Sequence, residues 1–526
     1  MKWPFSKRKK DNPADRFSDG YIEELLKDTD NIELTRIPAI FPLLLTRSDV
    51  LKRRTASMLT KHVACLTILE LAKLDALFRE RTSLDWSMDW SKENPENLLL
   101  PNMPEEQRVI ILGLCSFHPN GYFREKALIL LNQYTSGKEW PFLLLRCKDW
   151  VAAVRGAADK YVERRLNDKY MAEIVSSLPL VFKWQLKKEH LFQQVAQVLS
   201  QPESLPFLKE GTSAKDRNVR YFCYQMIMHA NLYDKELLVN LYKKEKDPLV
   251  RQSLFNELVS SLKAHEFKEH YSIFKRDKFP SIRLKGLEVF HSYFPEISGR
   301  ELEAALLDKS STIRYFARFL LKKQKTSIDF SSFYMGMLNA NQYIRESLLG
   351  IGETGSKEQA QLIQPYLYHS RISITKAAIH AISKLDGAKY KQEFIQLLQS
   401  EMIGISKAAR KAIAQLYYED IKDYLYDIYK EASYEHTKYN ITILLCSLSK
   451  WEAIFYSISF YVQCENREVS RLGKSALLKW INHFNRSFVT PSSEQMNALI
   501  TLLSSNRERL QNEEVTAIEF YMKGFH

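Results

Sequence analysis

The chain has 526 residues, of which 45% are hydrophobic, and only 16 are glycine and 17 proline. This length exceeds what one compact core usually reaches, so it predicts several domains or a repeat array. The scarcity of glycine and proline argues against a turn-rich all-β fold and favours helix. An excess of 76 Lys and Arg over 63 Asp and Glu favours anionic partners, such as nucleic acid, an anionic membrane surface or an acidic protein.

Residues 1–48 are predicted to form a basic N-terminal arm and a capping helix. Lys7 to Lys10 lie beside Trp3 and Phe5, and this short run is more typical of a mobile arm than of a lipid or nucleic-acid contact. The arm contains no apolar stretch suited to a signal peptide. No segment of the chain approaches the roughly 20 apolar residues that a membrane span needs.

The cysteines form no C-x-x-C pair and lie in apolar helical stretches. They are predicted to be small core residues of a reduced, cytoplasmic protein. The six are Cys65, Cys115, Cys147, Cys223, Cys446 and Cys464.

Residues 78–107 form a polar, proline-containing insertion in the predicted repeat region. It contains two tryptophans, Trp86 and Trp90, in a loop-like stretch. Such a pair can anchor a partner, but it more often folds back to cover an edge of the repeat stack.

An internal repeat is the strongest pattern in the sequence. Asp or Asn, a short gap and then Val or Ile followed by Arg return along the chain, with a small or apolar residue three positions after the Arg. From Arg220, the arginines follow at 251, 283, 314 and 345, at intervals of 31, 32, 31 and 31 residues. The chain would contain about 13 such units, each too short to bury its own apolar face, so neighbours must stack.

Residues 233–264 show what one unit should look like. An apolar stripe predicts a first helix, which Asp247-Pro248 ends. Asp247 suits the N-cap of the second helix and Pro248 its first turn. Val250, Leu254 and Leu258 then form a buried stripe at spacings of four. The predicted fold is therefore all-α: an α-solenoid, wound as a right-handed superhelix of helical hairpins, over residues 49–485, with C-terminal capping helices at 486–526.

The repeated arginine lies near the start of the second helix, where the helix dipole does not favour a cation. We therefore expect it to pair with an acidic residue of its own or a neighbouring repeat, forming a structural ladder of ion pairs. The predicted ladder consists of Arg155, Arg220, Arg251, Arg283, Arg314 and Arg345, with Asp216, Asp247, Asp277 and Asp308.

The Val/Ile-Arg-x-x-Ala pattern resembles the short HEAT repeats of the phycobilisome-lyase type. The stretch Ile344-Arg345-Glu346-Ser347-Leu348-Leu349-Gly350-Ile351-Gly352 carries the resemblance best. The resemblance covers about residues 45–485 and implies stacked hairpins of about 30 residues. It says little about function, because such repeats scaffold, bind peptides, bind nucleic acid and occasionally carry an enzyme.

Gly350 to Gly355 spells a dinucleotide fingerprint, but the fingerprint requires a preceding strand, whereas an amphipathic helix precedes it here. We therefore interpret it as the exit from a helical hairpin. The histidines form no metal-ligand motif, and no nucleophile signature occurs. The sequence thus predicts a protein that is not an enzyme, with no cofactor and no metal site.

The first and fifth residues after the repeat arginine, or after the residue that takes its place, point to the side of the second helix opposite the core. In this type of solenoid the second helices usually line the concave face, so these residues predict a partner-binding surface. Exposed apolar residues there favour a protein interface, although burial between twisted repeats is an equal alternative. The predicted residues are Tyr221, Gln225, Gln252, Asn256, Leu284, Tyr315, Phe319, Lys376, Lys407 and Lys411.

Two functions remain open at this point. The first is a non-enzymatic scaffold or adaptor that holds a partner protein or peptide on the concave face. The second is a nucleic-acid binder of the kind that the HEAT-like alkylpurine DNA glycosylases represent, although the catalytic acid of those enzymes matches no residue here. Phosphate binding would weaken steeply with salt, and an apolar protein interface would not.

Overall fold

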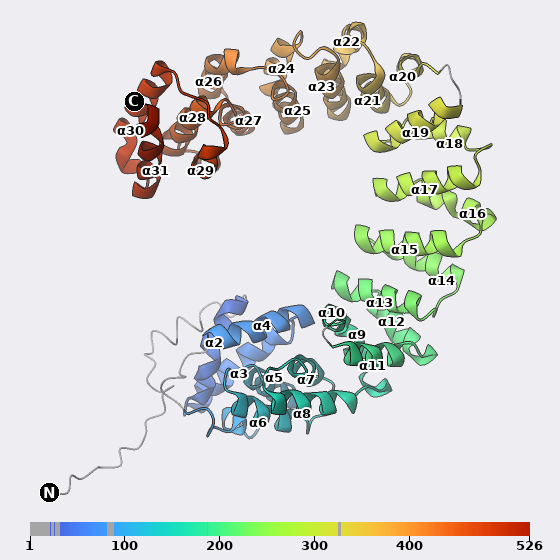
Figure 1. The fold of residues 1–526 in the computed structure, drawn as a ribbon, viewed down its shortest axis with the longest axis vertical. Coiled ribbons are helices and arrows are strands. Elements are labelled where there is room, and N and C mark those ends of the chain that lie inside the picture. Colours follow the sequence, from blue (N-terminus) through green and yellow to red (C-terminus); the bar gives the residue numbers. More distant parts are fainter. Residues whose placement is uncertain are drawn as a thin grey trace, which may run out of the picture. The chain divides into compact units, whose positions relative to one another are not determined.

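The computed structural model describes residues 32–81, 89–186, 188–324 and 328–525, together with Ile22 and Leu26. The predicted arm residues Trp3, Phe5 and Lys7 to Lys10 lie outside the described residues, as does Trp86. Within those ranges the chain forms helices joined by short turns, and no strand occurs (Figure 1). The fold is an all-α solenoid, as the repeat period predicts.

The chain divides into two compact units, Met1–Phe267 and Lys268–His526. The sequence did not predict this division, because the repeat period runs through it without a break. Within the described ranges, none of the helices combines the length and the hydropathy needed to cross a bilayer.

The first unit consists mainly of paired short helices. Their bounds are α2 (Ile37–Ile40), α3 (Asp49–Val63), α4 (Ile68–Arg81), α5 (Glu105–Cys115), α6 (Gly121–Leu131), α7 (Trp140–Arg146), α8 (Ala152–Glu163), α9 (Met171–Ser176), α10 (Leu178–Lys183), α11 (Glu189–Leu199), α12 (Leu205–Gly211), α13 (Arg217–His229), α14 (Lys235–Lys244) and α15 (Pro248–Ser261). The division between the units falls within α16 (Ala264–Phe274).

The second unit continues the same alternation of first and second helices. Its helices are α17 (Pro280–Tyr293), α18 (Gly299–Ala305), α19 (Ser311–Gln324), α20 (Phe330–Asn339), α21 (Ile344–Thr354), α22 (Lys357–Ile363), α23 (Ile372–Asp386), α24 (Lys391–Leu398), α25 (Ile403–Ile413), α26 (Lys422–Glu431), α27 (Glu435–Leu445), α28 (Lys450–Gln463), α29 (Arg467–His483), α30 (Ser493–Asn506) and α31 (Asn512–Met522).

The α14–α15 hairpin has the local structure that its sequence predicts. The side chain of Asp247 accepts hydrogen bonds from the backbone N–H groups of Leu249 and Val250, at 3.0 and 3.3 Å, and so caps α15. Pro248 occupies the first helical position, where a missing N–H costs nothing. Val250, Leu254 and Leu258 are buried along one face of the helix.

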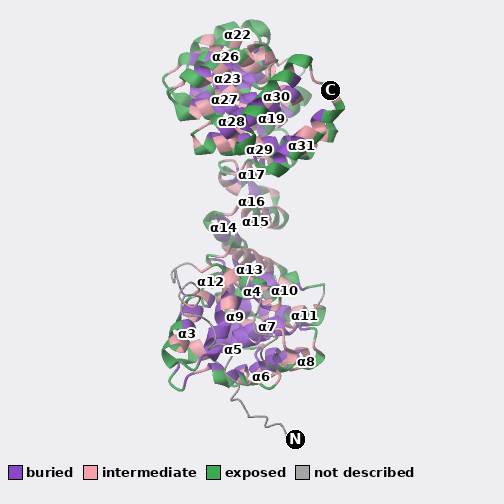
Figure 2. Cartoon of the chain, turned by 90° about the vertical axis from the view of Figure 1, so that its left-hand side faces the viewer, coloured by how far each residue is buried: buried purple, intermediate pink, exposed green. Residues whose placement is uncertain are grey.

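The second unit contains a continuous apolar core. One cluster of buried residues runs from Leu287 to Val469, and a second joins the last hairpins through Trp451, Trp480 and Met522. Figure 2 shows buried residues along the helix faces that meet inside the unit and exposed residues on its outside. Each hairpin therefore gains its stability from the hairpins on either side.

The repeat arginine binds the backbone at the end of the preceding first helix. In six repeats its Nη1 donates to the carbonyl oxygen six residues earlier, at distances of 2.6 to 2.9 Å. These bonds join Arg124 to His118, Arg155 to Asp149, Arg220 to Ala214, Arg251 to Glu245, Arg283 to Asp277 and Arg314 to Asp308. The arginine thus supplies a donor to carbonyls that the turn would otherwise leave without one.

The same arginine often reaches an acid 25 residues later, in the next repeat. Arg283 makes two bonds to the carboxylate of Asp308, at 2.7 and 2.8 Å, and Arg124 binds Asp149 in the same way. Arg220 binds Glu245 at 3.3 Å. The guanidinium groups of Arg283 and Arg124 each join one hairpin to the next through two hydrogen bonds.

The predicted ladder of arginine and aspartate pairs is only partly present. Among the predicted residues, the structure brings together Arg283 and Asp308. Arg314 instead binds Glu353 on α21, and Arg345 binds its neighbour Glu346. Asp216 and Asp247 cap α13 and α15 through their side chains, which is a role for which Asp and Asn are equally suited.

Later repeats replace the arginine with a hydroxyl residue that keeps the backbone contact. The hydroxyl of Thr375 donates to the carbonyl of His369, also six residues earlier, at 2.9 Å. Ser406 donates to the carbonyl of Leu398 at 2.6 Å. A side-chain donor to a backbone carbonyl is therefore present even in these repeats without the arginine.

The interpretation of Gly350 to Gly355 as the exit from a hairpin holds only for Gly355, which is the C-cap of α21. Gly350 and Gly352 lie inside α21 rather than at its exit, and both are buried. A Cβ on Gly350 would lie 2.3 Å from the Tyr334 ring, and one on Gly352 would lie 2.6 Å from Cα of Ala381. Gly350 is therefore not on the exposed side of the helix; the two glycines allow α20 and α23 to pack closely on α21.

The insertion at 78–107 is only partly loop. Its first residues complete α4, which contacts α2 and α10. Asp75 and Arg79 of α4 pair with Arg146 and Asp149 of the α7–α8 hairpin. Trp90 is 2% exposed and its ring lies 4.0 Å from that of His118. Trp90 thus covers the repeat stack and is not available to anchor a partner.

The predicted burial of the cysteines holds for some of them. Cys115, Cys147 and Cys223 are buried, whereas Cys446 and Cys464 are half-buried. Cys65 is exposed, because it lies in the turn after α3 rather than on a helix face.

We predict that Arg283→Met lowers the stability of the protein by about 1–3 kcal/mol, because it removes the guanidinium that donates to the Asp277 carbonyl and pairs with the Asp308 carboxylate. The midpoint of urea denaturation measures the change. Arg300→Met, at an exposed position of the same unit, serves as the control and should leave the midpoint almost unchanged.

We also predict that iodoacetamide at pH 8 modifies Cys65 much faster than Cys223 in the folded chain. Burial raises the pKa of the Cys223 thiol to about 12 and also blocks access to it. Peptide mass spectrometry after timed quenching gives both rates. Equal labelling of the two thiols without denaturant would contradict the burial described here.

Candidate interaction surface

The predicted binding residues fall on second helices of both units. In the first unit they lie on α13 and α15. In the second they lie on α17, α19, α23 and α25. The structure brings together three residues in the first unit and separates the second-unit residues into an aromatic group and a basic group.

A groove of about 500 Å³ lies between α13 and α15. Tyr221, Gln252 and Asn256, all predicted from the repeat register, line it, and Leu249 stands exposed beside them. The Nε2 of Gln252 donates to Asn256 at 3.2 Å, while its buried Oε1 has no hydrogen-bond partner.

Two other predicted residues, Gln225 in the first unit and Leu284 in the second, have structural contacts. Gln225 of α13 donates to the hydroxyl of Ser253 on α15 at 2.8 Å, and this bond bridges the two helices. Leu284 on α17 is half-buried against the core of the second unit and does not stand free. Leu284 was predicted on the exposed stripe; packing between neighbouring helices covers it instead.

Two aromatic side chains stand exposed on α19. Tyr315 is 66% and Phe319 is 46% exposed, and their spacing of four places them on one face of the helix. The ammonium of Lys323 lies 4.9 Å from the centroid of the Phe319 ring. On this helix the exposed surface thus combines two rings with a cation.

A buried ion-pair group lies on α19 and α21. Both Arg314 and Arg318 bind the carboxylate of Glu353, the second at 2.9 Å, and Arg318 also donates to the Tyr334 hydroxyl at 3.2 Å. Burial opposes ionisation of Glu353, but its hydrogen bonds and the charges of the two arginines outweigh burial and hold its pKa below the usual value.

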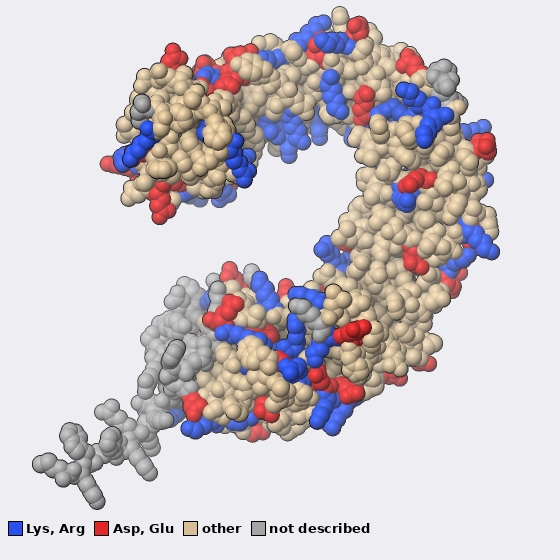
Figure 3. All heavy atoms as spheres, viewed as in Figure 1, with Lys and Arg blue, Asp and Glu red and all other residues tan. Residues whose placement is uncertain are grey.

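A basic group lies on α23 and α25. Lys376, Lys407 and Lys411, all predicted, are exposed, and no carboxylate pairs with them among the residues that the structure describes. Figure 3 shows Lys and Arg side chains gathered on one side of these helices. The predicted surface of the second unit is therefore apolar and aromatic on α19 and cationic on α23 and α25.

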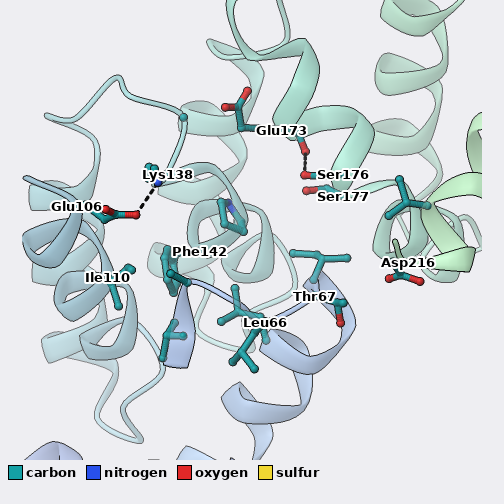
Figure 4. A pocket seen from close by; sticks show the side chains of 17 residues that line it. Leu66, Thr67, Glu106, Ile110, Lys138, Phe142, Glu173, Ser176, Ser177 and Asp216 are labelled. Atoms are coloured by element: carbon teal, nitrogen blue, oxygen red, sulfur yellow. Dashed lines mark hydrogen bonds and ion pairs between the residues drawn. The ribbon is translucent and has the colours of Figure 1, made fainter. Parts of the chain in front are cut away.

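A separate cavity of about 310 Å³ lies in the first unit (Figure 4). It forms because the start of α4 lies across α5, α7 and the start of α13, leaving a space that Leu66, Ile110 and Phe142 line. The sequence does not predict this cavity, because no local pattern shows which helices lie beside the start of α4. Its size matches the lower end of small-ligand pockets.

The polar groups around this cavity are already engaged. Lys138 pairs with Glu106 at 2.6 Å, Ser176 donates to the carbonyl of Glu173 at 2.8 Å, and Ser177 accepts a bond from Trp140. Figure 4 shows the first two pairs pointing toward one another. No histidine or cysteine is among the lining residues.

Metal binding has no support in the described ranges. Nowhere in them do three or more His, Cys, Asp or Glu side chains gather in a way that could hold a metal ion.

Comparisons with known proteins give likenesses of fold only. No protein-family model matches the chain. No curated protein matches its sequence. The S. pombe condensin Cnd3-Cnd2 subcomplex is 15% identical, covering 96% of this chain and 76% of that chain, with a TM-score of 0.35.

Two structures containing Kap95 are also similar. Kap95p bound to RanGDP is 8% identical, covering 94% of this chain and 66% of that chain, with a TM-score of 0.29. The Kap95:Nup1 complex is 11% identical, covering 95% and 62%, with a TM-score of 0.23. The chain thus spans about two thirds of these two chains, and such low TM-scores carry no functional inference.

We predict that lowering the pH from 5 to 3 destabilises wild type more than Glu353→Gln. A carboxyl whose pKa is depressed by folding contributes stability above its unfolded pKa of about 4.3, and this contribution is lost as the pH falls through the folded pKa. Urea midpoints of both proteins across this range test it. Parallel pH profiles would show that the pair contributes nothing at neutral pH.

Proposed function

We propose that the protein is a non-enzymatic scaffold that binds a partner protein or peptide along exposed faces of its second helices. The observation that carries the proposal is the exposure of Tyr315 and Phe319 on one face of α19. Large aromatic side chains are costly to expose together unless a partner covers them, and they are enriched at the centres of protein interfaces.

The stacking of the hairpins supports the same function. Buried apolar clusters link successive hairpins within the second unit, so its surface is held in place before a partner arrives. Ordering costs on binding are then small, and modest contacts on several helices can add up.

Further parts of the proposal concern classification and location. We assign the chain to the short, phycobilisome-lyase-type class of HEAT repeats, with the 31-residue spacing as support. The domain arrangement we propose is an arm and cap at 1–48, the solenoid at 49–485 and a C-terminal cap at 486–526. We also propose a cytoplasmic location.

Nucleic acid is the alternative partner, because the positive charge of the basic group on α23 and α25 also suits phosphates. The two functions differ in their salt dependence. Binding through about six phosphate contacts weakens by roughly 10³-fold between 50 and 200 mM salt, whereas an apolar protein interface changes little.

We predict that Tyr315→Ala/Phe319→Ala reduces partner capture by about tenfold or more, since interface aromatics carry much of the binding energy. Full-length protein is immobilised, exposed to lysate of the source cells, washed at both salt concentrations and analysed by quantitative mass spectrometry.

Leu362→Ala/Tyr368→Ala is the matched control, because it removes two equally exposed apolar side chains from a first helix and the turn after it. Proteins lost with the α19 variant, kept with the control and retained at high salt support the proposal. Nuclease-sensitive capture that vanishes at high salt, or identical capture by both variants, contradicts it.

A further inference from the structure

Exposed apolar residues mark the starts of two neighbouring second helices. Ile372 begins α23, Ile403 begins α25, and Met402 precedes it; their exposed fractions are 41%, 64% and 38%. A Cβ built on Gly404 would lie 3.5 Å from Cγ2 of Ile372, so the two helix starts are in contact. The three exposed apolar side chains thus belong to two helix starts that touch one another, and together they make this end of the helix pair apolar.

Cations follow the apolar patch one turn along each helix. Lys376 is four residues after Ile372, and Lys407 is four residues after Ile403, which places each lysine on the same face as the apolar residue before it. The side chain of Lys376 also lies beside α25, with Cδ 3.6 Å from a Cβ built on Gly404. Lys376 thus lies against the start of α25, three residues before Lys407.

None of the lysines of this group pairs with a carboxylate among the described residues, although the exposed Glu401 precedes Met402 in the chain. Helix α25 carries Lys407, Arg410 and Lys411 and no acidic residue. The nearest acid on the adjoining helix α21, Glu353, is already bound by two arginines. Burial lowers the pKa of His380 on α23, and the cations around it, Lys384 foremost, add to this effect, whereas Glu353 opposes it.

We propose that this apolar and cationic patch on α23 and α25, comprising Ile372, Met402, Ile403, Lys376, Lys407 and Lys411, binds an acidic peptide segment with apolar side chains. This inference rests on the proposed function and names the chemistry of the partner. Apolar side chains of the peptide lie against the helix starts, and its carboxylates lie against the lysines one turn on.

The composition of the patch favours a peptide over nucleic acid. Single strands bind through aromatic rings on which bases stack, and neither α23 nor α25 contains Phe, Tyr or Trp. Three aliphatic side chains offer nothing to phosphates. Adjacent helices lie about 10 Å apart, so about six extended residues of a peptide span both helices.

The test uses the full chain and fluorescein-labelled probes. The acidic probe is a peptide of about twelve residues that repeats Leu-Glu-Ile-Asp, and its control repeats Leu-Gln-Ile-Asn. A thymidine oligonucleotide of about twenty residues represents nucleic acid. Fluorescence anisotropy should show the acidic peptide binding at least about tenfold more tightly than either of the other probes.

Two variants locate the site. Lys376→Glu/Lys407→Glu should weaken acidic-peptide binding by at least about tenfold, and Met402→Ala/Ile403→Ala should weaken it without changing net charge. Lys309→Glu/Lys357→Glu makes the same charge change at exposed positions outside the patch and should leave binding within about twofold. Circular dichroism confirms that all variants remain helical.

Several outcomes overturn the inference. Equal binding of both peptides, tighter binding of the oligonucleotide, or unchanged peptide binding by Lys376→Glu/Lys407→Glu each excludes an acidic-peptide site here. A partner that depends on Tyr315 and Phe319 but still binds Lys376→Glu/Lys407→Glu leaves the scaffold function in place and removes only this patch from it.

Discussion

Each hairpin has to satisfy the backbone carbonyls where its first helix ends and the chain turns into the second. The repeat arginine does this from the second helix, by donating to the carbonyl six residues earlier. With its remaining N–H groups it can reach an acid in the next repeat, as Arg283 does with Asp308. In such a repeat one side chain therefore closes its own turn and also links the hairpin to its neighbour.

The features of the fold that could be predicted from the sequence are those that local patterns determine. The 31-residue period, the capping role of Asp247 and the buried stripe of α15 follow from local patterns that only one geometry satisfies. The contact between the arginine and the carbonyl could not be predicted, because every residue has a backbone carbonyl and the sequence does not show which one accepts the bond. The pairing of Arg314 with Glu353 was equally hidden, since that acid lies outside the motif, 39 residues away.

The candidate surface was predictable in its residues but not in its arrangement. Periodicity placed Tyr315, Phe319 and Lys407 on the outer side of their helices, where the structure also has them. Packing between helices decided which of the predicted residues are covered. Leu284 packs against the apolar core of its unit, whereas a groove remains between α13 and α15 beside Tyr221. The register cannot reveal such packing, because it depends on side-chain volumes from several repeats at once.

Close packing of α21 against α23 has a mechanical consequence. Gly352 lets the two backbones approach until only Ala381 separates them, so this junction contains little free volume and resists compression and sliding. Between α13 and α15 the open groove leaves room for either movement. A load along the first unit should therefore be taken up by bending at that groove, while the α21–α23 pair in the second unit moves as a rigid block.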